Sequence, residues 1–240
     1  MAQEQAGEGR WFYFSMAVLS AAIIFAGFAP SYYLKNVFQA PPPLSPLTSL
    51  HGIVFTAWTL LSVLQTGLIA VNRPGLHRNL GILGAVLFGV VIAVGVTTAI
   101  VAGQLGHVPP GAPPPLVFMA LPLVAMTGVT ILVLIALANR SRPGVHKRLM
   151  LAGFFLMTAP ALHRLSLGAG YVEAGTWVSL IGPDLLLLGA ALYDLVSRRR
   201  IHPAYLCSAL IYAALNVAVI WAFSSPSWLA FATRLVGGSS

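Results

Sequence analysis

The run LVFMALPLVAMTGVTILVLIALA, residues 116–138, decides the fold class, because none of its residues carries a charge. A helix needs about 20 apolar residues to cross the hydrocarbon core of a bilayer. The run is continuously apolar and does not alternate, so it does not have the pattern of a membrane β-strand. It therefore predicts a transmembrane helix.

Six further runs have the same length and character. They are Trp11–Ala29, Leu47–Val71, Leu80–Ala102, Leu149–Leu167, Trp177–Val196 and Pro203–Phe223. Charged residues make up 8% of the chain, against about 25% in soluble domains, so a soluble globular protein is excluded. We expect an all-α, polytopic membrane bundle of seven transmembrane helices in one domain, residues 1–240. A tail at 1–10 precedes the helices at 11–223, and a tail at 224–240 follows them.

The basic residues lie mainly at one end of the predicted helices. Ten are on this side: Arg10, Arg73, Arg78, Arg140, Arg142, Lys147, Arg148, Arg198, Arg199 and Arg200. Only Lys35, Arg164 and Arg234 lie near the other side. The positive-inside rule then predicts a cytoplasmic N-terminus and an external C-terminus. Because membrane topology accounts for the net charge of +8, we expect the lipid bilayer as a partner and no nucleic acid.

A short motif occurs twice before outward-running helices. Residues 73–78 read RPGLHR, and residues 142–147 read RPGVHK. A looser third copy, RRIH, covers residues 199–202. One interpretation is three helical hairpins related by an axis along the membrane normal. The other is a tight Pro-Gly turn with a basic anchor, which needs no repeat.

Three ionisable residues share the outer third of the predicted membrane. His51, His163 and Asp184 lie about 6, 7 and 10 Å inside their helices at a rise of about 1.5 Å per residue. Arg164 is next to His163 and can neutralise an anion there. Pro183, which precedes Asp184, is expected to break its helix. Ionisable residues within a membrane are costly, so these are candidates for function.

Three interpretations of this outer cluster stay open. In the first, His51 and His163 ligate a haem iron and Arg164 meets a propionate. In the second, His51, His163 and Asp184 form a two-histidine, one-carboxylate site for zinc, iron or copper. In the third, the cluster is structural: Asp184 pairs with Arg164, and the histidines bond to backbone or water.

A second group of histidines lies at the cytoplasmic side. His77, His146 and His202 each occupy the N-terminal end of a helix, where the helix dipole favours neutral imidazole. Together they can bind zinc or copper, or His77 and His146 can ligate an inner haem; the alternative is interfacial histidines beside arginine anchors. Asp194 and Arg198 are four residues apart and are expected to form an ordinary helical ion pair.

Some classes are excluded by residues that the chain lacks. No lysine occurs in the predicted seventh helix, which excludes a retinal Schiff base. No P-loop motif is present, so the chain is not an ATPase by itself. Cys207 is the single cysteine, which excludes an internal disulfide and a cysteine-ligated cluster.

Several stretches resemble a family of uncharacterised bacterial multi-pass membrane proteins. They are LHGIVFTAW at 50–58, LHRNLG at 76–81, HKRLM at 146–150 and RIHPA at 200–204. The resemblance covers the chain from about His51 to Pro203, and it implies the topology, these histidines as family motifs and a bacterial cytoplasmic membrane. The chain is also loosely similar to two-haem transmembrane cytochromes b, although its cytoplasmic histidines lie at different depths.

The sequence thus leads to three hypotheses for function. The first is a membrane redox protein that binds b-type haem and exchanges electrons with a quinone or a small partner. Its outer ligands are His51 and His163, and its inner ligands are His77 and His146. The second is a metal-dependent membrane enzyme with the His51, His163 and Asp184 site, or with His202 in an inner site. The third is a transporter or assembly subunit without catalysis.

Overall fold

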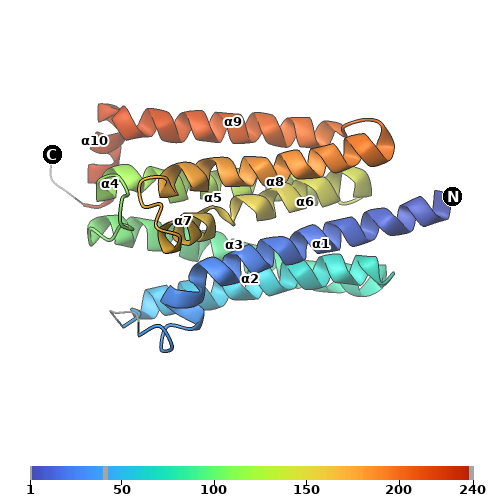
Figure 1. Cartoon of the computed structure of the whole chain (residues 1–240), viewed down its shortest axis with the longest axis horizontal. Coiled ribbons are helices and arrows are strands. Elements are labelled where there is room, and N and C mark those ends of the chain that lie inside the picture. Colours follow the sequence, from blue (N-terminus) through green and yellow to red (C-terminus); the bar gives the residue numbers. More distant parts are fainter. Residues whose placement is uncertain (1, 40–42, 238–240) are drawn as a thin grey trace. The chain divides into compact units, whose positions relative to one another are not determined.

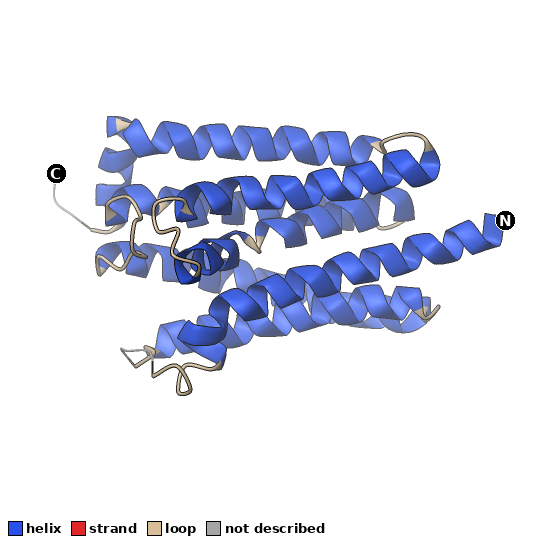
Figure 2. Ribbon diagram, viewed as in Figure 1, coloured by secondary structure: helices blue, strands red, loops and turns tan. Residues whose placement is uncertain are grey.

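The computed structural model describes residues 2–39 and 43–237, and all regular structure in these ranges is helical (Figure 2). Among these residues, seven helical segments are long and apolar enough to cross a membrane. The expected all-α membrane fold is thereby confirmed. The chain divides within its third long helix into two compact units, Met1–Val94 and Gly95–Ser240, and each is described by itself.

The first unit contains α1 (Ala2–Phe28), the π-helical turn η1 (Ala29–Tyr33), α2 (Pro46–Ala70) and most of α3 (Pro74–Gln104). Helix α1 begins at Ala2, within the stretch expected to be a tail. It packs against α2 (Figure 1). Trp58 of α2 meets Phe88 of α3, with ring centroids 5.1 Å apart. These contacts bring the three segments of this unit together.

The second unit contains four spans and a short terminal helix. Their elements are α4 (Pro115–Phe118), α5 (Ala120–Ala138), α6 (Pro143–Leu156), α7 (Ala159–Gly168), α8 (Gly175–Arg198), α9 (Pro203–Ser224) and α10 (Pro226–Leu235). Helix α6 contacts α5, α8 and α9 and so lies at the centre of this unit, while α8 and α9 run side by side (Figure 1). Trp228 of α10 donates from Nε1 to the Leu116 carbonyl at 2.9 Å, which attaches α10 to α4.

Proline begins many of these helices. Among the described elements, α2, α3, α4, α6, α9 and α10 all start on one. The first helical position tolerates proline because its N–H would have no partner there, and the fixed φ already suits a helix. Ser45 and Ser225 cap α2 and α10 by accepting the amides of Thr48 and Trp228. The sequence thus marks the starts of these helices clearly.

The fifth predicted span is broken, although its sequence is one apolar run. Helix α6 ends at Leu156 and α7 begins at Ala159. Pro160, just after this break, has no N–H to donate to the Leu156 carbonyl, so one helical hydrogen bond is missing there. The buried Thr158 donates its hydroxyl to Phe155 O at 2.6 Å. An interrupted backbone at membrane depth is tolerated where protein buries it, and this segment lies against α5, α8 and α9.

Pro183 does not break α8, and that expectation was wrong. The helix runs from Gly175 to Arg198 with Pro183 inside it and buried. Only the hydrogen bond to the Ser179 carbonyl is lost to the missing N–H. The Ser179 hydroxyl donates back to Thr176 O at 2.7 Å. Burial of Pro183 in the packed unit holds the helix together across this position.

Large apolar side chains are exposed along the long helices. Val196 of α8 is 76% exposed, and Leu210 of α9 is 73% exposed. Soluble monomers rarely expose contiguous apolar surface on this scale. Together with the length of the helices, this exposure identifies the chain as an integral membrane protein whose apolar faces contact lipid.

Candidate functional site

The ring of His163 is buried within the second unit, where α7 meets α8. Its residue is 3% exposed. A Cβ atom added at Gly175 would lie only 2.9 Å from the His163 ring, so the absence of a side chain at Gly175 allows this close approach. The Phe118 ring lies on another side, 6.4 Å away between centroids. The site of His163 is therefore made by α4, α7 and the start of α8.

Neither ring nitrogen of His163 makes a hydrogen bond. The backbone of Gly175 is the polar group beside the ring. Its geometry does not make a hydrogen bond with either ring nitrogen. A buried polar group without a hydrogen bond costs roughly 1–3 kcal/mol by mutational measures. Buried side-chain nitrogens are therefore nearly always paired. A buried imidazole without hydrogen-bond partners inside a membrane helix is a candidate ligand for a metal ion or a haem iron.

The two other polar groups of the predicted outer cluster in this unit have different partners. Asp184 of α8 accepts a hydrogen bond from Asn216 of α9, with Nδ2 and Oδ2 3.0 Å apart. Arg164 donates to Pro160 O at 3.2 Å. Asn216 was not identified from the sequence, because an amide within an apolar run gives no periodic signal. The Asn216 amide gives one oxygen of the Asp184 carboxylate a hydrogen-bond donor from the protein itself.

His51 belongs to the first unit and lies half-buried near the start of α2. Its ring stacks on Phe55 one turn later, with centroids 4.0 Å apart and planes at 20°. This contact fixes the orientation of the imidazole on its own helix. The pairing of His51 with His163 joins the two units and stays a prediction.

The two copies of the RPGxH motif have the same local structure in their separate units. His77 Nδ1 lies 3.2 Å from Gln65 O, on the preceding helix α2. His146 Nδ1 lies 2.8 Å from Ala136 O, on the preceding helix α5. A carbonyl oxygen only accepts, so Nδ1 carries the proton in both rings. The lone pair is then on Nε2, the tautomer found where an imidazole ligates a metal and a carbonyl orients it.

The third, looser copy of the motif behaves differently. His202 is the N-cap of α9, and its Nδ1 accepts the Ala204 amide at 3.1 Å. In the neutral ring the proton is then on Nε2, so His202 in this conformation presents a hydrogen-bond donor there. Burial lowers the pKa of His202 below its ordinary value, and the nearby Arg148 acts in the same direction. Its assignment to a metal site stays a prediction.

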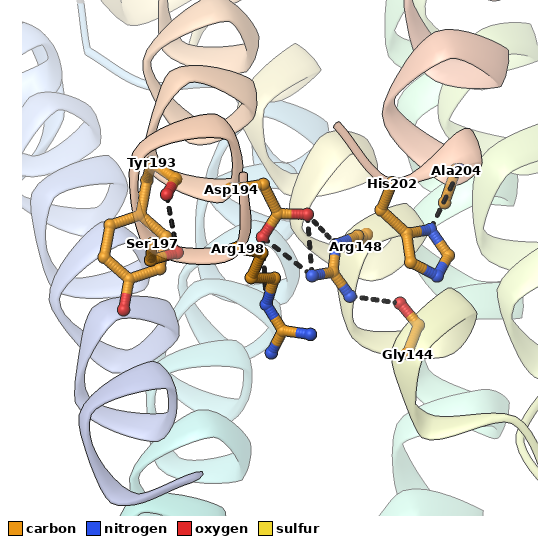
Figure 3. A network of polar contacts seen from close by, with 8 residues as sticks. All are labelled: Gly144, Arg148, Tyr193, Asp194, Ser197, Arg198, His202 and Ala204. Atoms are coloured by element: carbon orange, nitrogen blue, oxygen red, sulfur yellow. Dashed lines mark hydrogen bonds and ion pairs between the residues drawn. The ribbon is translucent and has the colours of Figure 1, made fainter. Parts of the chain in front are cut away.

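Figure 3 shows a buried ion pair beside His202 that sequence reasoning did not find. Arg148 of α6 donates from Nε to Asp194 Oδ2 at 2.8 Å and from Nη2 to Oδ1 at 2.7 Å. Both side chains are essentially inaccessible, at 0% and 1% exposure. Arg148 also donates from Nη1 to Gly144 O at 2.8 Å, and its guanidinium lies 5.5 Å from the Tyr205 ring centroid.

The expected helical ion pair of Asp194 and Arg198 is present, but it is not the main contact of Asp194. The two are in contact, with Arg198 Nε 3.5 Å from Oδ1. However, Asp194 is buried, and its closer, two-pronged partner is Arg148, 46 residues earlier in the chain. Arg148 was counted with the basic residues at the cytoplasmic ends of the helices, whereas it lies buried in the helix packing. Sequence spacing shows a partner one turn away but not one on another helix.

No group of three or more histidine, cysteine, aspartate or glutamate side chains gathers for metal binding within the part of the chain that the structure describes. The proposed triad takes His51 from one unit and His163 and Asp184 from the other, so it stays a prediction. Comparison with protein-family models, curated proteins and solved structures finds no match. The class defined by the fold is therefore that of a seven-helix integral membrane protein.

Proposed function

We propose that this protein is a membrane redox protein that binds b-type haem and exchanges electrons with a quinone or a small redox partner. The observation that carries the proposal is the buried His163 ring, neither nitrogen of which makes a hydrogen bond. A neutral imidazole with an unused lone pair, held against apolar protein, is the donor that haem iron takes in membrane cytochromes. When bound, haem supplies one-electron chemistry.

The residues around His163 fit the binding of such a group. Gly175 and Phe118 fix the plane of the imidazole. Arg164 follows it in the chain and, as a cation near the predicted outer end of the span, would pair with a propionate. His51, oriented by Phe55, is the proposed second ligand from the other unit.

His77 and His146 are the proposed inner ligands. The tautomer of the two rings supports this proposal. Gln65 O and Ala136 O accept from Nδ1, so the lone pair of each ring is on Nε2. Carbonyl acceptors of this kind orient ligating imidazoles in many metal sites. Because the two motif copies share the arrangement, the inner pair would have matched geometry at the predicted cytoplasmic face of a bacterial membrane.

The test compares absorbance of the purified full-length protein before and after reduction with dithionite. We expect sharp haem bands that His163→Leu removes or strongly diminishes. His107→Leu is the matched control, because His107 is exposed in the loop between α3 and α4, and it should keep the full bands. Equal bands in both variants would exclude His163 as a ligand, and no bands in the parent protein would contradict the proposed function.

A further inference from the structure

A charged pocket lies at the end of the second unit where α8 turns into α9. It has a volume of about 340 Å³ and is lined by Asp194, Arg198, Arg200, Ile201, His202 and Pro203. None of these residues is used in the proposed haem sites, and His202 belongs only to the alternative metal site, which stays a prediction. The pocket is open to the surface, and Arg198 and Arg200 at its wall are exposed.

The pocket carries more positive than negative charge. Its single carboxylate, Asp194, is already held by the two-pronged contact with Arg148. Arg198 reaches Asp194 only at 3.5 Å. Arg200 adds a second exposed cation, and Lys147 lies within electrostatic range of Arg198. The pocket residues themselves therefore supply too few anions for this end of the unit.

The second unit has few other acidic residues. The whole chain has five, and three of them, Glu173, Asp184 and Asp194, belong to this unit. Glu173 precedes the opposite end of α8. Asp184 lies ten residues before Asp194 on the same helix, which is about 15 Å along its axis. Among the described residues of the second unit, Asp194 is therefore the one carboxylate at the pocket, and an anionic ligand would offset the remaining positive charge.

Local structure adds to the attraction for an anion. The pocket includes the N-terminal end of α9, where the helix dipole is positive. His202 and Pro203 form its first turn, and Arg199, with a left-handed φ of 57°, turns the chain between the helices. Apolar surface adjoins these charges, because the exposed Leu195 lies one turn before Arg198 on α8 and the exposed Leu206 lies one turn after His202 on α9. The ligand that fits is therefore both anionic and apolar.

We propose that this pocket binds the phosphate headgroup of an anionic phospholipid, with Arg198 and Arg200 at the phosphate and the acyl chains along α8 and α9. Basic pockets between transmembrane helices bind such headgroups in other membrane proteins. Inorganic phosphate shares the charge but not the apolar part. The exposed Leu195 and Leu206 favour the lipid.

The experiment measures lipid binding to the full-length protein in detergent by native mass spectrometry. Phosphatidylglycerol is titrated against phosphatidylcholine as the zwitterionic reference. We expect tighter binding of phosphatidylglycerol, weakened about fivefold by Arg200→Gln and about 25-fold by the double change of Arg198 and Arg200 to glutamine. Binding of phosphatidylcholine should not change. Both arginines are exposed, so the variants should fold, and thermal unfolding checks this.

Arg140→Gln is the matched control. Arg140 is an exposed arginine in the turn before α6, at the same predicted side but outside the pocket. An equal loss in this variant would contradict the proposal, because the effect would then come from diffuse charge. Equal binding of the two lipids by the parent protein would also overturn it. Displacement of phosphatidylglycerol by equimolar inorganic phosphate would assign the pocket to a soluble anion and overturn the lipid assignment.

Discussion

Arg148 and Asp194 form the most deeply buried charged contact found in the described part of the second unit. Two short hydrogen bonds join the guanidinium and the carboxylate, and a third joins Arg148 to the Gly144 carbonyl. Removing two charges from water costs several kcal/mol per ion unless partners satisfy them. The geometry meets this requirement, so the pair joins α6 to α8 in one fixed arrangement.

Breaking this pair should be costly. Arg148→Gln leaves a buried carboxylate without its main partner, and we expect a loss of about 3–5 kcal/mol in the free energy of unfolding. Unfolding of the purified protein by titration with a denaturing detergent measures it. The control is Arg148→Met combined with Asp194→Leu, which should recover most of the loss because no buried charge remains. A single variant as stable as the parent protein would contradict the account.

His202 should make stability depend on pH. Burial lowers its pKa in the folded protein below the ordinary value of 6.5, so the unfolded chain binds the proton more readily. The stability that neutral His202 contributes is present above about pH 6.5, and it decreases as the pH falls towards the pKa of His202 in the folded protein. We expect a lower unfolding midpoint at pH 5 than at pH 8. His202→Asn keeps a capping side chain and should flatten this difference; an unchanged pH profile would exclude His202 as its source.

The residues of the candidate site were only partly predictable from the sequence. The spacing of the apolar runs indicated that His163 and Asp184 lie within the membrane, since an ionisable residue inside such a run is conspicuous. The partners of Asp184 and Asp194 come from other helices, Asn216 and Arg148. Which faces of two helices meet depends on packing, which the order of residues along one helix does not specify.

At the scale of elements, Gly128 of α5 has close neighbours on two other helices of the second unit. A Cβ atom there would overlap Leu215 of α9 and come within 3.1 Å of Leu156 of α6. Gly128→Val should therefore lower the free energy of unfolding by about 1–3 kcal/mol. Gly189→Ala in α8 is the control, because nothing lies within 4 Å of its added Cβ. Equal stability of the two variants in detergent unfolding would contradict this packing.

The ends of the helices followed from the sequence better than their interruptions did. Proline at the first position and serine caps mark the starts of α2 and α10. Pro160 and Pro183 both lie in apolar runs, yet only Pro160 follows a break, between α6 and α7. Loss of one backbone hydrogen bond is common to both. Tertiary packing decides whether the helix continues, and a single sequence does not contain that information.

At the scale of the whole molecule, the basic residues predict which side each loop occupies. With Cys207 changed to alanine, one new cysteine is placed at Ser141 or at Ser227, both exposed. In intact cells a membrane-impermeant maleimide should label Ser227→Cys on the outside and leave Ser141→Cys unlabelled until the cells are lysed. Labelling of Ser141→Cys but not of Ser227→Cys in intact cells would contradict the predicted orientation. His77 and His146 would then lie at the outer face.

The most direct test of the proposed function is a spectroscopic redox titration of the purified full-length protein. We predict reversible reduction of b-type haem bands, with separate changes on loss of His163 and of His146, because these histidines are assigned to different groups. A spectrum without haem bands in the oxidised and the reduced protein would contradict the redox assignment. Bands that persist unchanged in both histidine variants would contradict the ligands.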